Sequence, residues 1–119
     1  MNRSEAINKG FTFYKKWRTQ KTYSPALDTE ISITRKGWNH ITNKRRTYKD
    51  VIRRIKLLPY AQKLIKKSTT IQNIRRDKSK TFIAMEHIFD LNVNKKVRVI
   101  LESENENSYR FLSVMDKKI

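Results

Sequence analysis

The spacing of apolar residues changes at Ser68, and this change constrains the fold more than any other feature of the chain. Before Ser68, apolar side chains recur every three or four residues, which is typical of amphipathic helices. After it, they fall in short runs separated by polar links, which is typical of strands joined by turns. Helices followed by strands form the α+β class. We therefore expect N-terminal helices packed on a twisted antiparallel sheet of about four strands.

The part of the chain before Ser68 is expected to be mainly helical. Ile7, Phe11, Tyr14 and Trp17 fall at helical spacing after Ser4, which is a suitable N-cap. The expected elements are a helix over 4–19, a loop or linker over 20–30, a strand over 31–34 that Gly37 ends, a short helix that carries His40, a helix from an N-cap at Thr47 to Leu58, and a helix from Pro59 to Lys67.

The part after Ser68 is expected to form an antiparallel meander. The expected strands are 69–74, 81–88, 97–101 and 109–115, with turns at 78–80, 92–95 and 102–108. Successive side chains of a regular strand point to opposite faces. We therefore expect Ser113 to share a face with Tyr109 and Phe111, opposite Leu112 and Val114.

The chain is strongly basic, with 28 Lys and Arg against 11 Asp and Glu and a formal net charge of +17 over 119 residues. Such a field favours a polyanion or an acidic protein as the partner. The lack of cysteine excludes disulfides and cysteine-based zinc sites, and two histidines argue against a His-rich metal site. No apolar run reaches the roughly 20 residues of a membrane span, and the start lacks the apolar stretch of a signal peptide. We expect a soluble chain that uses no metal and no cofactor.

His40 is the leading candidate for a chemical role. Its ordinary pKa allows proton transfer near neutrality. Lys44 follows one helical turn later, and Arg45 and Arg46 come next. Because an arginine fork can hold a phosphate through two hydrogen bonds, this grouping suits metal-free RNA cleavage. The alternative is a structural histidine that bonds to backbone beside a solvated basic face.

Four other residues have weaker support in the sequence. His87 follows Glu86 in an apolar strand, and packing or a cross-strand hydrogen bond is its favoured role. Trp38 is expected in the core. Thr81 and Ser113 carry hydroxyls on the last strands, where a hydroxyl is usually only tolerated.

The segment 33–41, which contains Gly37-Trp38-Asn39-His40, resembles the barnase/EndoU/colicin/RelE-like nuclease superfamily. The later segment 57–61 and the terminal sheet share this resemblance, which covers roughly residues 31–117. The nearest likeness is to phage-associated branches and to the toxin ends of contact-dependent growth inhibition proteins. It implies helices packed on a twisted sheet, metal-independent cleavage of RNA, often tRNA, and an immunity protein that blocks the site.

The resemblance also implies roles for particular residues. It divides the chain into an N-terminal helix and linker, 1–30, and a nuclease-like domain, 31–119, within one compact domain. The implied catalytic residues are the motif histidine, the two cations after it, and two strand hydroxyls: His40, Lys44, Arg45, Thr81 and Ser113. The implied RNA-binding residues are Arg46, Arg53, Arg54 and Tyr109.

The sequence thus favours a ribonuclease toxin that cuts RNA by transesterification, with His40 as general acid or base. Its expected partners are RNA, with tRNA as the favoured kind, and an acidic immunity protein. It is expected to act in the cytoplasm of a target bacterium, as the C-terminal piece of a larger secreted or phage-delivered protein. Two alternatives stay open. One is a non-catalytic RNA-binding module, and the other is a protein-interaction domain that docks an acidic partner.

Overall fold

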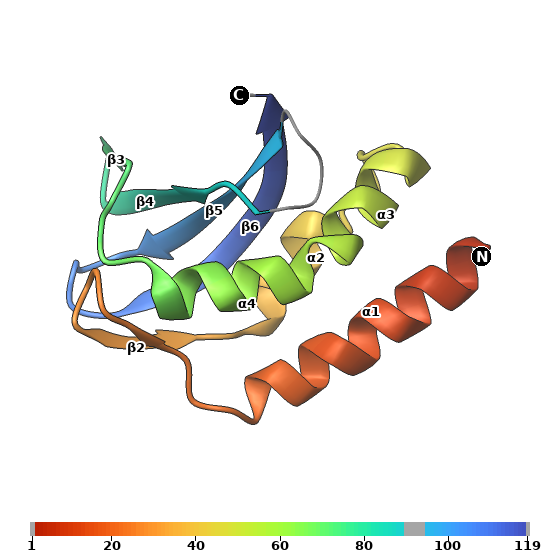
Figure 1. Ribbon diagram of the computed structural model, residues 1–119, viewed down its shortest axis with the longest axis horizontal. Helices are drawn as coiled ribbons and strands as arrows, with labels where there is room; N and C mark the ends of the chain where they lie inside the picture. Colours follow the sequence, from red (N-terminus) through yellow and green to blue (C-terminus); the bar gives the residue numbers. More distant parts are fainter. Residues whose placement is uncertain (1, 90–94, 119) are drawn as a thin grey trace.

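All four helices precede strands β3 to β6 in the chain, and the fold belongs to the α+β class (Figure 1). The computed structural model describes residues 2–89 and 95–118. In chain order the elements are α1 (Arg3–Arg18), β1 (Tyr23–Ser24), β2 (Thr29–Ser32), α2 (Arg35–Ile41), α3 (Tyr48–Lys56), α4 (Leu58–Lys67), β3 (Asn73–Asp77), β4 (Lys80–His87), β5 (Lys95–Ser103) and β6 (Tyr109–Lys118).

The strands form one mixed sheet in the order β1-β2-β6-β5-β4-β3. Strands β3 to β6 make the expected antiparallel meander. The expectation of a wholly antiparallel sheet of about four strands is wrong in one respect, because β2 adds to β6 in parallel, with Ile31 opposite Tyr109, and β1 pairs with β2. The strand expected over 31–34 corresponds to β2, which begins and ends two residues earlier, whereas β1 has only two residues and shows no alternation in sequence. β1 lies in the expected 20–30 loop, and β2 crosses the expected boundary after residue 30.

The helix boundaries follow local capping chemistry. Asn2 caps α1 by accepting a hydrogen bond from the backbone N–H of Glu5, so the expectation of Ser4 as the cap is wrong. Thr47 caps α3 through the N–H of Asp50, as expected. Pro59 lies in the first turn of α4, also as expected. Gly37 does not end a strand, because it lies inside α2.

The strand boundaries differ from the expected ones at two places. β3 begins at Asn73, later than the expected strand over 69–74. β5 continues through Glu102 and Ser103, which were expected in an acidic turn. Residues 92–94 of the turn expected at 92–95 lie outside the described residues.

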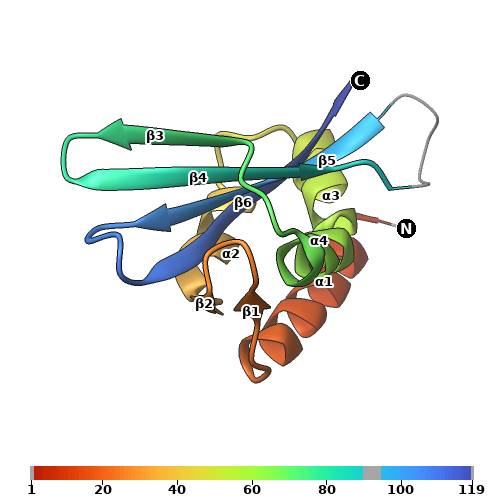
Figure 2. The same ribbon diagram turned by 60° about the vertical axis from the view of Figure 1, so that its left-hand side comes forward.

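The core lies between the helices and one face of the sheet (Figure 2). Tyr14 and Trp17 of α1 are buried against Phe111 of β6, with 5.1 Å between the ring centroids of Trp17 and Phe111. Trp38 of α2 joins the same cluster, as the sequence predicted. Large rings in mutual edge-on and tilted contact hold α1 and α2 in fixed positions on the sheet.

Candidate functional site

Gly37 allows α2 to lie directly against β6. A Cβ atom at this position would lie 2.6 Å from the carbonyl oxygen of Phe111 and 2.5 Å from Oη of Tyr14, which is too close for real atoms. Residues three and four apart on a helix share one side. α2 therefore presents Lys36 and His40 together to a cavity that β6 also lines.

A β-bulge in β6 directs Ser113 into the same cavity. Ile100 of β5 pairs with Ser113, whereas the next residue pairs with Phe111, so Leu112 is the extra residue. Because the bulge shifts the alternation, Phe111 and Val114 both face the core, while Leu112 and Ser113 both line the cavity. The expectation that Ser113 shares a face with Phe111 is therefore wrong.

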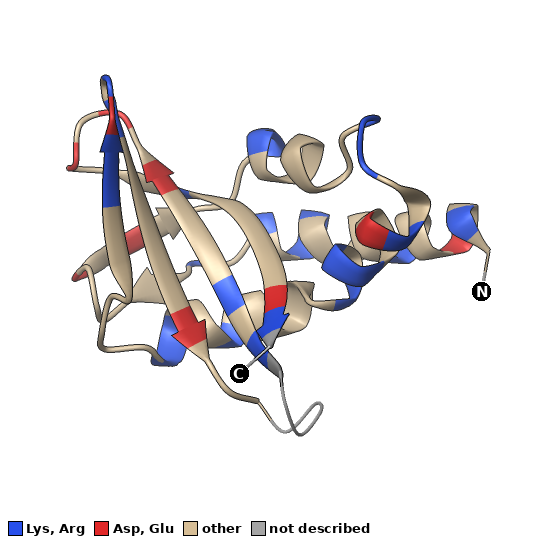
Figure 3. Ribbon diagram, turned by 90° about the horizontal axis from the view of Figure 1, so that it is seen from above, with Lys and Arg blue, Asp and Glu red and all other residues tan. Residues whose placement is uncertain are grey.

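The cavity has a volume of about 570 Å³, which falls in the usual range for ligand sites. Its sheet side is largely apolar and its border is basic. Among the described residues that line it, six are cationic and one is acidic: Lys36, Arg46, Arg54, Arg75, Lys80 and Arg98 against Glu102. Lys and Arg recur along the helices, whereas the strands of the sheet carry both basic and acidic residues (Figure 3). The cavity is thus suited to an anionic ligand.

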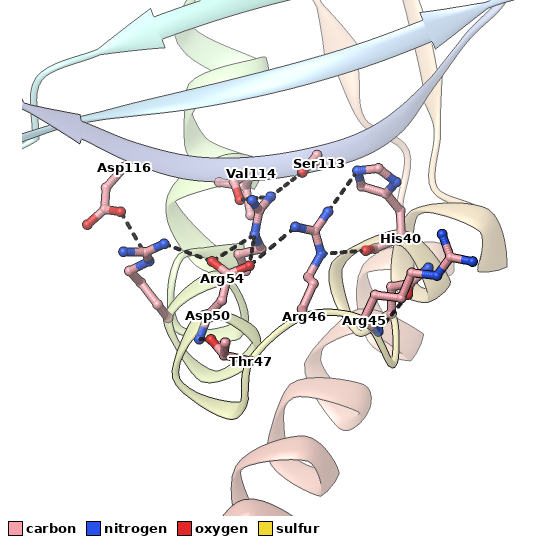
Figure 4. A network of polar contacts seen from close by, with 11 residues as sticks. His40, Arg45, Arg46, Thr47, Asp50, Arg54, Ser113, Val114 and Asp116 are labelled. Atoms are coloured by element: carbon pink, nitrogen blue, oxygen red, sulfur yellow. Dashed lines mark hydrogen bonds and ion pairs between the residues drawn. The ribbon is translucent and has the colours of Figure 1, made fainter.

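Arg46 contacts His40 twice (Figure 4). Its Nε donates to the carbonyl oxygen of His40 at 2.9 Å, and its Nη2 lies 3.1 Å from His40 Nε2. A guanidinium has only donors, so Nε2 must accept this hydrogen bond through its lone pair. The proton of the neutral ring then resides on Nδ1.

The surroundings of His40 favour its neutral form. Burial lowers the pKa of the imidazole below its ordinary value of 6.5, and the charges of Arg46, Arg54 and Lys36 lower it further. Glu102 opposes this effect by raising the pKa. A histidine with a lowered pKa is neutral at pH 7 and is able to accept a proton.

Asp50 joins three guanidinium groups below the cavity (Figure 4). Its carboxylate accepts hydrogen bonds from Arg46 at 3.2 Å, Arg53 at 2.7 Å and Arg54 at 3.1 Å. Arg54 also donates to Oγ of Ser113 at 2.7 Å. Partial burial raises the pKa of Asp50, but the bonds from Arg53, Arg54 and Arg46 outweigh it and lower the pKa overall. Asp50 therefore stays ionised and fixes the direction of these cations.

Glu102 is a second buried anion, and the sequence analysis did not identify it. Its side chain is 3% exposed and contacts Lys36 at 2.7 Å, Arg110 at 2.5 Å and Lys80 at 3.6 Å. Burial alone raises its pKa, whereas Lys36 and Arg110 lower it by a larger amount. The signal was available, because alternation along β5 places Arg98, Ile100 and Glu102 on one face.

Of the other predicted catalytic residues, Ser113 lines the main cavity with His40, whereas Lys44, Arg45 and Thr81 do not. Lys44 and Arg45 are exposed on the turn after α2, and the side chain of Arg45 points away from Asp50 (Figure 4). Arg45 borders a neighbouring shallow cavity, together with His40 and Arg53. Thr81 faces away from the main cavity, and its hydroxyl donates to Glu106 at 2.8 Å.

Some of the predicted RNA-binding residues line the main cavity and others do not. Arg46 and Arg54 line the main cavity. Arg53 is more exposed and contacts Asp50 and Asp116. Tyr109 lies at the start of β6, opposite Ile31 and away from the cavity.

Two further features bear on the expectations from sequence. His87 is exposed and contacts the ring of Phe89, with 4.7 Å between the ring centroids. In residues 2–89 and 95–118, no three His, Asp or Glu side chains group as metal ligands do. No helix in these ranges combines the length and apolar character needed to cross a membrane.

A scan of the chain against models of protein families finds no match, and neither curated proteins nor solved structures give one. The likeness to the nuclease superfamily therefore rests on the residues of the chain itself.

Proposed function

We propose that the chain is a metal-independent endoribonuclease whose general base is His40. One observation supports this proposal above the others. A neutral imidazole lies in a cavity of about 570 Å³, beside guanidinium groups that the Asp50 carboxylate holds in place. Proton transfer and binding of a phosphate are the two requirements of RNA transesterification.

In the proposed reaction, His40 takes the proton of the ribose 2′-OH. The 2′-oxygen forms a bond to the adjacent phosphorus, and the bond from phosphorus to the 5′-oxygen breaks. The products are a 2′,3′-cyclic phosphate and a 5′-OH, whose proton comes from solvent. Arg46, Arg54 and Lys36 would stabilise the negative charge that develops on the phosphate and leaving oxygens.

Arg46 links phosphate binding to activation of the base. In the free protein its Nη2 occupies the lone pair of His40 Nε2. A phosphate oxygen is a stronger acceptor for a guanidinium than a neutral imidazole, because the bond to it is charge-assisted. A bound phosphate would therefore draw Arg46 from His40 and free Nε2 for the 2′-OH.

The wider setting is also a proposal and rests on charge and resemblance. A net charge of +17 suits tRNA as the substrate and an acidic immunity protein as the inhibitor. The Gly37–His40 motif suits a toxin that acts in the cytoplasm of a target bacterium. Delivery as the C-terminal piece of a larger secreted or phage-delivered protein belongs to the same proposal.

Incubation of the purified protein with total tRNA and EDTA tests the reaction. We expect cleavage to 2′,3′-cyclic phosphate ends with chelator present, and no cleavage of duplex DNA. His40→Ala should lose cleavage but keep RNA binding, whereas His87→Ala is the matched control because His87 lies outside the cavity. Cleavage that stops in EDTA and returns with a divalent metal would refute the proposal.

A non-catalytic RNA-binding module is the second candidate. The same bond from Arg46 to Nε2 favours it, because a histidine that accepts this bond permanently has only a structural role. RNA binding with unchanged RNA lengths on a denaturing gel, under all conditions above, would support this candidate.

A further inference from the structure

The wall of the cavity that the sheet forms differs in character from its basic border. Apolar side chains of three strands contribute to this wall: Phe82 and Ala84 of β4, Ile100 of β5, and Leu112 and Met115 of β6. Phosphate and ribose do not match such a surface, because both are polar. A flat apolar group on the ligand would fit it better.

Phe82 offers an aromatic surface within this apolar part. It lies on β4 with its side chain partly exposed, and Arg75 of β3 is its direct cross-strand partner. The Arg75 guanidinium carbon lies 4.7 Å from the centroid of the Phe82 ring. Guanidinium groups and aromatic rings both stack on nucleobases.

The partner of Phe82 on β5 connects this surface to the phosphate end. Glu102 lies directly opposite Phe82, and it holds Lys36, which is one helical turn from His40. Phe82, Lys36 and His40 thus line one continuous cavity. A nucleotide with its phosphate at Arg46 and Arg54 would extend its base along the sheet toward Phe82.

We propose that Phe82 and Arg75 form a subsite for one unpaired nucleobase next to the scissile phosphate, an inference that rests on the proposed ribonuclease function. The base takes the place of the Arg75 guanidinium on the Phe82 ring, and the guanidinium moves outward to cover the outer face of the base, because 4.7 Å between guanidinium and ring leaves no room for a base. A base within a duplex already stacks on both faces and cannot reach the sheet. The substrate class is therefore RNA that is single-stranded at the cut, such as a loop.

Binding of short 2′-O-methyl RNA strands to the full chain tests the subsite. The blocked 2′-oxygen prevents cleavage, so affinity is measured independently of catalysis. A series of fluorescent strands carries a single abasic nucleotide at each position in turn, and anisotropy gives Kd. We expect one abasic position to weaken binding to the parent protein by roughly 5- to 100-fold, the range for one stacked base.

Substitutions assign this effect to the subsite. Phe82→Leu keeps the apolar volume but removes the ring, and it should abolish the difference between intact and abasic strands. Arg75→Ala changes an exposed residue of β3, so it tests the subsite even if the Phe82 variant does not fold. Arg76→Ala is its control, since it removes the same charge from the same strand but faces Glu106. Arg76→Ala should keep the full abasic effect.

The possible outcomes distinguish failure of the subsite from failure of the proposed reaction. Equal affinity for intact and abasic strands at every position would overturn the subsite. So would an abasic effect that persists undiminished in both Phe82→Leu and Arg75→Ala, or cleavage of duplex RNA as fast as single strands. If unmodified RNA is not cut but the abasic effect is present and depends on Phe82, the subsite stands and the proposed reaction falls.

Discussion

Three carboxylates fix the cations around the cavity. Asp50 contacts Arg46 and Arg54, Glu102 contacts Lys36, and Glu86, which is 7% exposed, contacts Arg98 at 2.6 Å. A cation that is already oriented needs little reorganisation when charge develops on a phosphate. At the scale of single residues, the acidic side chains therefore matter as much as the basic ones.

Asp50 is a positioning residue in this arrangement. Asp50→Asn keeps the shape of the side chain but weakens its hold on Arg46 and Arg54, so their misplacement should lower kcat by about 10²-fold. Steady-state cleavage of a defined RNA measures this loss. Asp77→Asn on exposed β3 is the control, and it should leave kcat within a few-fold of the parent. Equal losses of kcat in both variants would mean that Asp50 affects cleavage only through the net charge of the protein.

The pH dependence of cleavage tests the role of His40. A general base acts in its deprotonated form, so kcat/KM should rise with pH through a pKa below 6.5 and then level off. Arg46→Ala removes a charge that lowers this pKa, and the rise should then move to higher pH. A rate that instead falls as pH increases through this pKa would assign His40 as the general acid.

The cations near His40 should differ in effect although each carries one charge. Arg46→Ala and Arg54→Ala should slow cleavage far more than Lys44→Ala or Arg45→Ala, because only the first two line the main cavity. Initial rates at fixed ionic strength give the comparison. Similar losses in all four variants would mean that the general field, and not the cavity, decides the rate.

At the scale of elements, Gly37 sets the position of α2. Gly37→Ala places a methyl group against Phe111 and Tyr14, and overpacking of this kind typically costs about 1–3 kcal/mol. We expect a lower Tm in thermal unfolding followed by circular dichroism, together with loss of cleavage. Asn39→Ala, an exposed change in the same helix, should have little effect on Tm. An unchanged Tm in Gly37→Ala would mean that α2 is not held at this contact.

Elements with a strong period were predictable from the sequence, and irregular ones were not. The stripe of α3 and the apolar runs of β4 to β6 gave correct elements. β1 is too short to carry a period, and the parallel addition of β2 to β6 depends on contacts distant in sequence. The bulge at Leu112 cannot be recognised from the alternation of apolar and polar residues. The face of Ser113 was therefore wrongly assigned.

The candidate site shows the same limit. His40 stood out because it is a rare residue type beside cations, and it does line the cavity. Its sequence neighbours Lys44 and Arg45 turn outward at the end of α2, whereas Arg54 and Glu102 reach the cavity from α3 and β5. Adjacency in sequence predicts a shared helix face only while the helix continues.

At the scale of the whole molecule, a net charge of +17 should make association with an acidic inhibitor fast and sensitive to salt. We expect a co-encoded acidic protein to cover the main cavity and to abolish cleavage at a stoichiometric ratio. Titration of the ribonuclease activity of the parent protein measures this, and a direct binding assay should show that Arg46→Ala binds the inhibitor more weakly. A tightly bound neighbour that leaves cleavage unchanged would argue against neutralisation.

The positive charge of the molecule has a further consequence at strand β3. It ends the strand order of the sheet, all five of its residues are exposed, and Ile74 is an apolar side chain open to solvent. An exposed edge strand of this kind can pair with the same strand of a second copy. Arg75 and Arg76 follow Ile74 directly, and like charges on two such edges repel. Arg75, which is proposed to bind RNA, and its neighbour Arg76 thus also disfavour aggregation, and this repulsion between copies is strongest while no polyanion masks the charge.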